Sequence, residues 1–341
     1  MQINLEEFLQ LRYQLPVVDV RSEGEFQEGH IRSALNIPLL NNNERIAVGT
    51  DYKQKGQAEA IKTGFRLVGP RLHNMIIDAQ QISNEIIVHC WRGGMRSSNF
   101  CQFVGMAGVK THQLKGGYKV YRQHAVESFA KPFQFLVVGG YTGSGKSEIL
   151  QALSRRGEQI IDLEGLAHHK GSAFGGLMMP AQPTTEQFQN ELFEEIAKLN
   201  LNKRIWIEDE SIAIGKIFLP QDLWQTMRTS VVVEMKVDKP IRIQRLVKEY
   251  GEADKGEFLQ AMINVTHKLG GQHFNKAKEK LLENDMYSTI DILLTYYDKA
   301  YLRGLEKKKH RVKLESSWDG ISSDNFAHEL ITRANALRIT A

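Results

Sequence analysis

The chain has 341 residues, of which 42% are hydrophobic and 25% charged, a composition typical of globular protein in about two domains. Its formal net charge of +4 tolerates a polyanionic partner without requiring one. Two cysteines exclude a disulfide scaffold and a cysteine-ligated zinc or iron–sulfur site, and they fit a reducing compartment. With no apolar run of ~18 residues and no signal-peptide pattern at the start, we expect a cytoplasmic protein that does not enter a membrane.

The first half of the chain alternates strand-like and helix-like segments. Short apolar runs at residues 16–20 and 85–89 predict buried parallel strands. The stretch 97–109 has helical periodicity, and it carries Cys101, which we interpret as core packing. Residues 40–78 show little periodicity and form an insertion, interpreted as a lid or as a decorated surface.

The second half repeats this alternation after a break near residues 129–132. Its expected elements are strands at 133–138, 159–163, 204–207 and 231–237, and helices at 146–155 and 185–199. Strands that alternate with helices predict a parallel sheet covered by helices on both faces. From residue 239 to 304 the pattern is almost entirely helical.

A glycine-rich loop with one cysteine follows the strand at 85–89. Cys90 precedes Arg92, a glycine pair and Arg96, and a helix follows. The first N–H groups of a helix lack helical partners and favour an anion, and the two arginines add positive charge. The loop should therefore favour a nucleophilic thiolate beside an oxyanion, which makes Cys90, Arg92 and Arg96 candidate catalytic residues. The alternative is a buried cysteine at a strand end.

A phosphate-binding loop is predicted at residues 140–147, where G-x4-G-K-[ST] lies between a strand and a helix. Backbone N–H groups should wrap phosphate oxygens, Lys146 should add a charge, and the Ser147 hydroxyl is placed for Mg²⁺. The predicted phosphate-binding residues are Gly140, Thr142, Gly143, Ser144, Gly145, Lys146 and Ser147. Glu208 and Asp209 follow a strand and are predicted as a second acidic element, with solvent-exposed acids as the alternative.

A polar loop follows the second strand of this half. It contains His168, His169, Lys170 and Ser172, and we interpret it as a substrate loop that contacts phosphate or RNA. An ordinary polar loop is the alternative. The paired histidines have no evident third ligand, so no metal site is predicted from them.

Residues 19–38, DVRSEGEFQEGHIRSALNIP, resemble the N-terminal signature of rhodanese domains. The resemblance implies that four polar residues of this segment are mainly scaffold: Asp19, Arg21, Glu25 and His30. Five residues separate Cys90 from Arg96, which resembles the spacing of phosphatase-type members of that superfamily rather than of common sulfurtransferases. The longer loop is expected to cradle a tetrahedral, phosphate-sized group.

Several further segments resemble tRNA 2-selenouridine synthases. They are residues 48–54, 90–97, 139–150, 162–175, 182–192 and 207–215. The resemblance implies an α/β protein with a rhodanese-like domain that has a parallel sheet, followed by a P-loop NTPase-like α/β domain with a helical C-terminal part. The expected bounds are 1–130 for the rhodanese-like domain, 131–238 for the P-loop core and 239–341 for a helical extension that is a candidate tRNA-binding part.

The resemblance also implies a two-step transferase reaction on the wobble uridine of tRNA. A 2-thiouridine is first S-geranylated from geranyl diphosphate, and selenium from selenophosphate then displaces the geranylthio group. Cys90 corresponds to the family's reactive cysteine, expected to carry selenium as S-selanylcysteine. The phosphate loop is a hypothetical site for the diphosphate of the prenyl donor, with a nucleotide or tRNA phosphate as alternatives. No tightly bound cofactor is expected, and Ser147 is the candidate position for Mg²⁺.

The implied macromolecular partner is the anticodon region of tRNA, and a monomer is favoured. The candidate tRNA-binding residues are a basic run near the C-terminus and helices around 239–280, with a solvated helix face as the alternative. The run comprises Lys307, Lys308, Lys309 and Arg311.

Two other functions fit the same motifs. One is a phosphatase or sulfurtransferase of the rhodanese superfamily fused to a nucleotide-binding, kinase-like domain. The other is a non-enzymatic RNA-binding switch gated by ATP or GTP.

Overall fold

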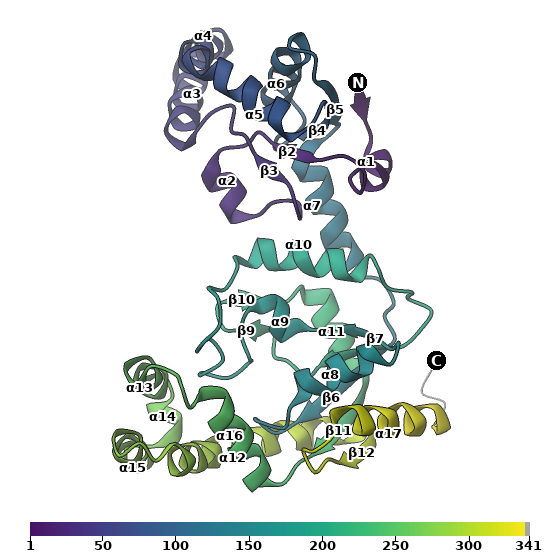
Figure 1. Ribbon diagram of the computed structural model, residues 1–341, viewed down its shortest axis with the longest axis vertical. Coiled ribbons are helices and arrows are strands. Elements are labelled where there is room, and N and C mark those ends of the chain that lie inside the picture. The colour runs from purple at the N-terminus through teal and green to yellow at the C-terminus, as the bar shows by residue number, and fades with distance from the viewer. Residues whose placement is uncertain (338–341) are drawn as a thin grey trace. The chain divides into compact units, whose positions relative to one another are not determined.

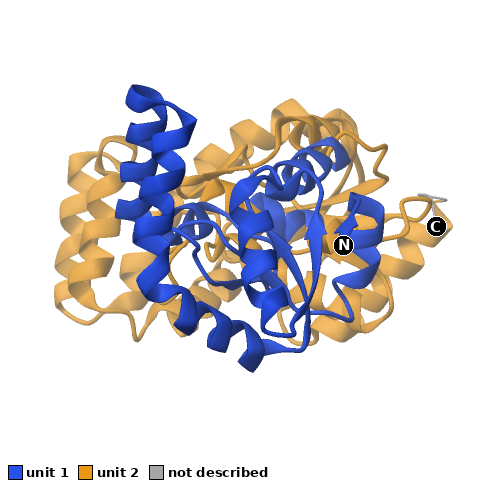
Figure 2. Ribbon diagram, turned by 90° about the horizontal axis from the view of Figure 1, so that it is seen from above, with its two compact units in different colours: residues 1–128, 189–193 blue, residues 129–188, 194–341 orange. Residues whose placement is uncertain are grey.

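The computed structural model describes residues 1–337 and divides into two units, coloured separately in Figure 2. Unit 1 comprises Met1–Ser128 and Gln189–Phe193, and unit 2 comprises the rest of the described chain. The division after Ser128 lies beside the expected domain boundary at residue 130. The assignment of Gln189–Phe193 to unit 1 has no counterpart in the sequence pattern, because it depends on packing between distant segments.

Unit 1 is built on five parallel strands in the order β1-β5-β4-β2-β3 (Figure 1). The strands are β1 (Gln2–Ile3), β2 (Val17–Asp19), β3 (Leu35–Asn36), β4 (Glu85–His89) and β5 (Lys110–Leu114). The helical segments are α1 (Leu5–Leu11), α2 (Glu23–Glu28), α3 (Asn42–Lys55), α4 (Gln57–Val68), η1 (Gly69–Arg71), α5 (Leu72–Ile82), α6 (Met95–Met106) and α7 (Gly117–Ser128). The central strand β4 therefore ends directly before Cys90.

The expected strands at 16–20 and 85–89 form β2 and β4. Ile86, Ile87 and Val88 are fully buried, as the continuous apolar run requires of a strand covered on both faces. The insertion at 40–78 is helical. It contains the hairpin of α3 and α4, and α3 buries no side chain, so its sequence lacks the apolar stripe by which an amphipathic helix is recognised.

Unit 2 holds a second five-stranded parallel sheet, in the order β12-β11-β6-β8-β7. Its strands are β6 (Phe135–Gly140), β7 (Gln159–Ile161), β8 (Ile205–Glu208), β11 (Val231–Lys236) and β12 (Val312–Ser317), and β9 (Ala213–Ile214) and β10 (Ile217–Phe218) form a separate antiparallel pair. The helical segments are α8 (Lys146–Arg155), α9 (Leu163–Ala167), α10 (Thr185–Ile196, partly in unit 1), α11 (Gln221–Thr229), α12 (Lys239–Tyr250), α13 (Lys255–Asn264), α14 (Thr266–Leu269), α15 (Gly271–Leu282), α16 (Met286–Lys308), η2 (Lys309–Arg311) and α17 (Ser323–Ala336). None of the described helices is both long and apolar enough to cross a membrane.

The C-terminal part is mainly helical as expected, but it also contributes a strand that the expectation lacked. β12 pairs in parallel with β11 and completes the sheet. Leu314 and Ser316 face inward between exposed neighbours, so this edge strand alternates within a charged stretch and has no continuous apolar run. Leu314 and Trp318 belong to the same buried cluster as the P-loop strand β6.

Candidate functional site

Cys90 lies in unit 1 between β4 and α6, where the loop positions its sulfur. The side chain is 3% exposed, and Sγ lies 3.2 Å from the Ser97 hydroxyl. Gln113 Nε2 donates to Ser97 Oγ at 2.9 Å and to Gly93 O at 2.8 Å. Because the Ser97 oxygen accepts this hydrogen bond from Gln113, the Ser97 hydroxyl proton can be donated to Cys90 Sγ or to Gly94 O. The sulfur is therefore held in a fixed orientation at the N-terminus of α6.

The cysteine loop packs closely against the start of α7. Gly93 and Gly117 have φ of 65° and 60°, and a Cβ on Gly117 would meet the Cys90 carbonyl oxygen at 2.3 Å. Tyr118 N donates to that same carbonyl at 2.8 Å. Only glycine fits both the backbone conformation and the space at position 117, so this pair of segments fixes the loop.

The two arginines of the loop are placed differently. Arg92 is exposed, whereas Arg96 donates to the Glu25 carboxylate at 2.6 and 3.1 Å. Burial raises the pKa of Glu25, but Arg96 outweighs it and lowers that pKa overall. Glu25, expected to be scaffold, is thus the partner of a predicted catalytic arginine. An oxyanion would have to compete with Glu25 for the Arg96 guanidinium.

The remaining rhodanese-signature residues build the support behind the loop. Arg21 pairs with Asp19 at 2.7 Å and its guanidinium lies 3.9 Å from the centre of the Tyr118 ring. Burial raises the pKa of Asp19, but His89 and Arg21 together lower it below its usual value. His30 stacks on Phe26. These buried contacts fit the scaffold interpretation.

The phosphate loop of unit 2 joins β6 to α8. Gly143 and Gly145 have φ of 81° and 79°, which curls the loop in the left-handed region that glycine tolerates. Ser147 Oγ donates to Glu164 Oε2 at 2.9 Å. Burial alone would lower the pKa of Lys146, but the carboxylates of Glu164, Glu210, Glu208 and Asp209 raise it above its usual value. Lys146 is therefore a cation held among acids.

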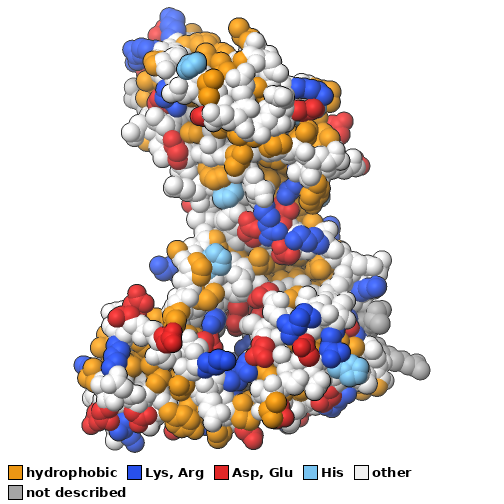
Figure 3. Space-filling model, in the orientation of Figure 1, with side chains coloured by type: hydrophobic (Ala, Val, Ile, Leu, Met, Phe, Trp, Pro, Cys, Tyr) orange, Lys and Arg blue, Asp and Glu red, His pale blue; other side chains and the backbone are white. Residues whose placement is uncertain are grey.

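A cavity of about 790 Å³ opens at this loop, and Figure 3 shows acidic and basic side chains around a hollow of unit 2. Of the predicted phosphate-binding residues, all but Ser144 line it: Gly140, Thr142, Gly143, Gly145, Lys146 and Ser147. Ser144 is 1% exposed, and its N–H donates to Tyr141 O at 3.0 Å. The Ser144 amide is consequently used inside the turn and does not face a ligand.

The acidic side of the cavity differs from the sequence-based expectation. Glu208 is fully buried and accepts from Leu163 N at 2.8 Å, and Asp209 pairs with Lys308. The acid in contact with Ser147 is instead Glu164 of α9. Burial and the Glu164 charge raise the pKa of Glu210, which also lines the cavity, to about 8. Sequence spacing could not single out Glu164, because α9 reaches the loop only through the fold.

The cavity also has an aromatic wall that the sequence did not indicate. Tyr250, Tyr296, Tyr297 and Tyr301 line it together with Leu246. Burial raises the pKa of Tyr297 and of Tyr301, so both phenols stay neutral at physiological pH. A polar phosphate end and an apolar aromatic side thus occur in one cavity.

The polar loop after β7 contributes two of its four candidates to the cavity. Lys170 and Ser172 line it, and Lys170 Nζ pairs with Glu249 at 2.6 Å. His168 instead ends α9 in a left-handed conformation with Nδ1 at 3.0 Å from Ala181 O. Burial lowers the pKa of His169, which is not among the lining residues. Neither histidine lines the cavity.

The structure buries two of the four residues of the predicted basic run. Lys308 is 3% exposed and pairs with Asp209, and Arg311 is 8% exposed and donates to Met227 O at 3.0 Å. Lys307 and Lys309 are exposed. Exposed and buried residues therefore follow one another along the run, because the end of α16 packs against the sheet.

A different basic pocket lies further along α16. Its volume is about 440 Å³, and it is lined by Lys268, His273, Tyr296, Lys299 and Arg303 among others. Lys268 and Tyr296 also line the phosphate-loop cavity, so the two hollows share a wall. Three cations and an aromatic ring at one pocket suit a polyanion with stacking bases.

The fold and the two loops define a rhodanese-like domain joined to a P-loop domain. A family model for rhodanese-like domains matches residues 4–124, and the family model described as the tRNA 2-selenouridine synthase AAA domain matches residues 133–329. The chain belongs to the tRNA 2-selenouridine synthase family. The expected fold class is thereby confirmed, and so is the class of tRNA-modifying enzyme.

Two solved structures are similar to parts of the chain. One is the N-terminal domain of a protein from Clostridium difficile 630 whose name refers to ATP/GTP binding; it is 42% identical, covers 36% of this chain and 98% of its own, and has a TM-score of 0.35. The other is a rhodanese-related protein from Thermoplasma volcanium, 18% identical, covering 36% of this chain and 91% of its own, with a TM-score of 0.24.

Proposed function

We propose that this enzyme converts 2-thiouridine to 2-selenouridine at the wobble position of tRNA in the cytoplasm, through an S-geranyl-2-thiouridine intermediate. Family membership supports the tRNA modification, and the cavity of unit 2 supports the prenyl step. The observation that carries the proposal is the combination, in that cavity, of a phosphate loop with a tyrosine wall.

The first step is assigned to unit 2. The diphosphate of geranyl diphosphate would lie on the loop at 140–147, where Lys146 offsets its charge, and the prenyl chain would lie along Tyr297 and Tyr301. The thiocarbonyl sulfur attacks the first carbon of the chain, the new S–C bond forms, and the C–O bond to diphosphate breaks. The uridine N3 proton is lost to solvent.

Mg²⁺ fits this site through oxygen donors. Ser147 Oγ and the Glu164 carboxylate are hard oxygen ligands in contact with each other, of the kind that Mg²⁺ takes together with phosphate oxygens and water. Among residues 1–337, no three His, Cys, Asp or Glu side chains are grouped to hold a metal by themselves. Bound Mg²⁺ would neutralise charge on the leaving diphosphate, and Glu164 and Ser147 would orient it.

The second step is assigned to the cysteine loop of unit 1. Selenium replaces the geranylthio group at C2 of the base, so the C–S bond breaks, a C–Se bond forms and geranylthiol leaves. Cys90 is the proposed carrier of selenium, with Ser97 fixing its sulfur. Loading of Sγ breaks the P–Se bond of selenophosphate, and water takes the phosphoryl group as inorganic phosphate. Formation of the selenylsulfide requires a two-electron oxidant such as a disulfide, and a thiol then reduces the selenylsulfide and releases selenium as selenide.

The tRNA backbone is proposed to contact the basic pocket of α14 to α16. Lys268, Lys299 and Arg303 supply the charge, and Tyr296 supplies a stacking surface next to the phosphate-loop cavity. This replaces the run at 307–311, two members of which are buried.

Mass spectrometry of wobble nucleosides tests the whole proposal. Cells with the intact gene should contain 2-selenouridine, and cells without it should retain 2-thiouridine. Purified enzyme with geranyl diphosphate and no selenophosphate should accumulate S-geranyl-2-thiouridine. Absence of the geranylated nucleoside under that condition would contradict the prenyl step, and hydrolysis of a chromogenic phosphate ester would favour the phosphatase alternative.

A further inference from the structure

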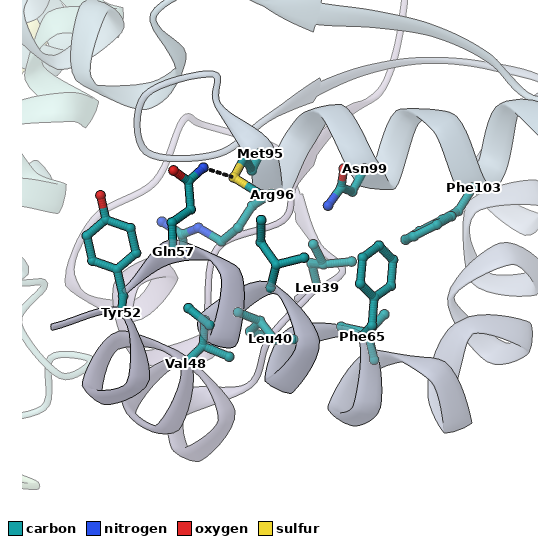
Figure 4. A pocket seen from close by; sticks show the side chains of 14 residues that line it. Leu39, Leu40, Val48, Tyr52, Gln57, Phe65, Met95, Arg96, Asn99 and Phe103 are labelled. Atoms are coloured by element: carbon teal, nitrogen blue, oxygen red, sulfur yellow. Dashed lines mark hydrogen bonds between the residues drawn. The ribbon is translucent and has the colours of Figure 1, made fainter. Parts of the chain in front are cut away.

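Unit 1 contains an apolar pocket that the two steps above leave without a role. The hairpin pocket, as we name it, has a volume of about 150 Å³ and lies between the α3–α4 hairpin and α6 (Figure 4). Leu39, Val48, Phe65, Met95 and Phe103 form its walls, which are almost entirely apolar. Tyr52 stands at one end, and Phe65 and Phe103 stand at the other.

The hairpin pocket is continuous with the cysteine loop. Met95 and Arg96, which line it, belong to the segment that begins at Cys90. Its floor residues Leu39 and Leu40 are members of the same buried cluster as Cys90. Gln57 Nε2 lies 3.9 Å from Met95 Sδ, so the start of α4 contacts the loop directly. A group bound in the pocket would lie next to the catalytic loop.

Several large apolar side chains that line the pocket are exposed. Phe65 is 57% exposed, Tyr52 60% and Met95 49%. Contiguous exposed apolar surface beside a polar rim is typical of a ligand or partner site. A volume of about 150 Å³ with apolar walls takes a hydrocarbon of roughly benzene size, and the mouth leaves room for more chain.

We propose that the hairpin pocket binds the geranyl chain of S-geranyl-2-thiouridine and so selects the geranylated base for the Cys90 step. This rests on the proposed function, and it assigns the prenyl chain a second site apart from the cavity at 140–147. Arg96 at the rim is the only cation among the described lining residues, and Glu25 holds it. The pocket therefore suits a neutral hydrocarbon attached to the base better than a free diphosphate.

Selection of the geranylated base by the hairpin pocket suits the chemistry of the displacement step. A thiocarbonyl sulfur is a poor leaving group, and S-alkylation converts it to a thiol that leaves readily. A pocket that binds the chain beside Cys90 positions only the activated base for displacement. Burial of each additional methylene favours binding, so binding should strengthen with chain length.

The experiment measures binding of full-length protein to short anticodon stem-loops whose 2-thiouridine is S-methylated, S-dimethylallylated or S-geranylated. Two substitutions alter the pocket. Gly64→Phe fills it from a lining position with open space beside it, and Val48→Gln makes a wall polar. Their matched controls are Gly49→Phe, which also has open space but does not line the pocket, and Ile46→Gln on the exposed side of α3.

Wild-type protein, Gly49→Phe and Ile46→Gln should bind the geranyl stem-loop tenfold or more tightly than the methyl one, equivalent to about 1.4 kcal/mol or more. Gly64→Phe and Val48→Gln should lose that difference and bind all three alike. Equal wild-type affinity for methyl and geranyl stem-loops would overturn the proposal. The proposal would also be overturned if the two control variants lost the preference for the geranyl stem-loop as fully as the pocket variants do. Weaker binding of geranyl diphosphate by Gly64→Phe than by the wild type would overturn it as well.

The readout separates this inference from the proposed function. Binding of pre-alkylated RNA needs neither selenophosphate nor turnover. If wild-type protein fails to convert 2-thiouridine with both substrates present, the proposed function fails. If it converts the base but binds all three stem-loops equally, only the hairpin pocket assignment fails.

Discussion

Ser147 Oγ donates a hydrogen bond of 2.9 Å to Glu164 Oε2, which connects the last residue of the phosphate loop to α9. Both oxygen atoms are ligands of the kind that Mg²⁺ binds, and Lys146 lies among acids that include Glu164. The loop therefore has its cation, its hydroxyl and its carboxylate in one cavity. This arrangement determines the first prediction.

Lys146→Ala should abolish geranylation while leaving selenation of pre-geranylated tRNA within about twofold. The reason is that Lys146 offsets charge on the diphosphate, and loss of a charged partner at such a site costs on the order of a hundredfold or more in rate. The two half-reactions are measured separately by mass spectrometry of the nucleosides. An equal loss of both steps would refute the assignment of the loop to the prenyl donor.

Cys90→Ala should show the reverse pattern, with geranylation retained and selenation lost. Ser97→Ala removes the hydroxyl 3.2 Å from Sγ and should slow selenation roughly tenfold, since one hydrogen bond is worth about 1–1.5 kcal/mol. Cys101→Ala on the same helix is the control, and it should leave both steps intact. Full selenation by the Cys90 variant would exclude the carrier role.

Thermal stability should depend on pH through Glu210. Burial and Glu164 raise its pKa to about 8, against 4.5 as the usual value. The folded state thus holds a proton that the unfolded state releases, and the stabilisation present at low pH is lost as pH rises toward about 8. Between pH 4.5 and about 8, Glu210 should lower the free energy of unfolding by about 1.4 kcal/mol for each pH unit. Melting temperatures measured across this pH range should fall less with pH in Glu210→Gln than in the wild type. The same dependence of melting temperature on pH in both proteins would contradict this prediction.

Lys308→Ala should destabilise the protein by about 3–5 kcal/mol, because it leaves Asp209 without its partner near the buried end of α16. Lys307→Ala, one residue earlier and exposed, should change the free energy of unfolding by less than about 0.5 kcal/mol. Denaturant unfolding measures both. Equal effects would mean that the exposed and buried lysines are equivalent, against the structure.

Charge removal at the basic pocket should weaken tRNA binding. Lys299→Ala with Arg303→Ala should lower affinity several-fold and reduce the salt dependence of the binding constant by about two phosphate contacts. Lys307→Ala is again the control on the same helix. An unchanged slope of affinity against salt would place the RNA contact elsewhere.

The sequence alone was sufficient to predict the parts of the protein whose structure and chemistry depend on residues that are neighbours along the chain. The cysteine loop, the phosphate loop, the strands β4 and β6 and the helix α8 are continuous segments, and their residue types and spacing carry their geometry. For that reason the sequence correctly predicted that Cys90 follows a buried strand and that Lys146 begins a helix.

Long-range packing decided the rest. Glu164 contacts Ser147 only because α9 lies beside the loop, and Lys308 is buried only because α16 ends against the sheet. The parallel pairing of β12 with β11, more than 70 residues apart, has no local signal. Arg96, read from the sequence as an anion ligand, is held by Glu25, 71 positions away. Local spacing determines which groups a loop contains, but the partners that set their charge and exposure come from distant segments, so only the tertiary structure decides them.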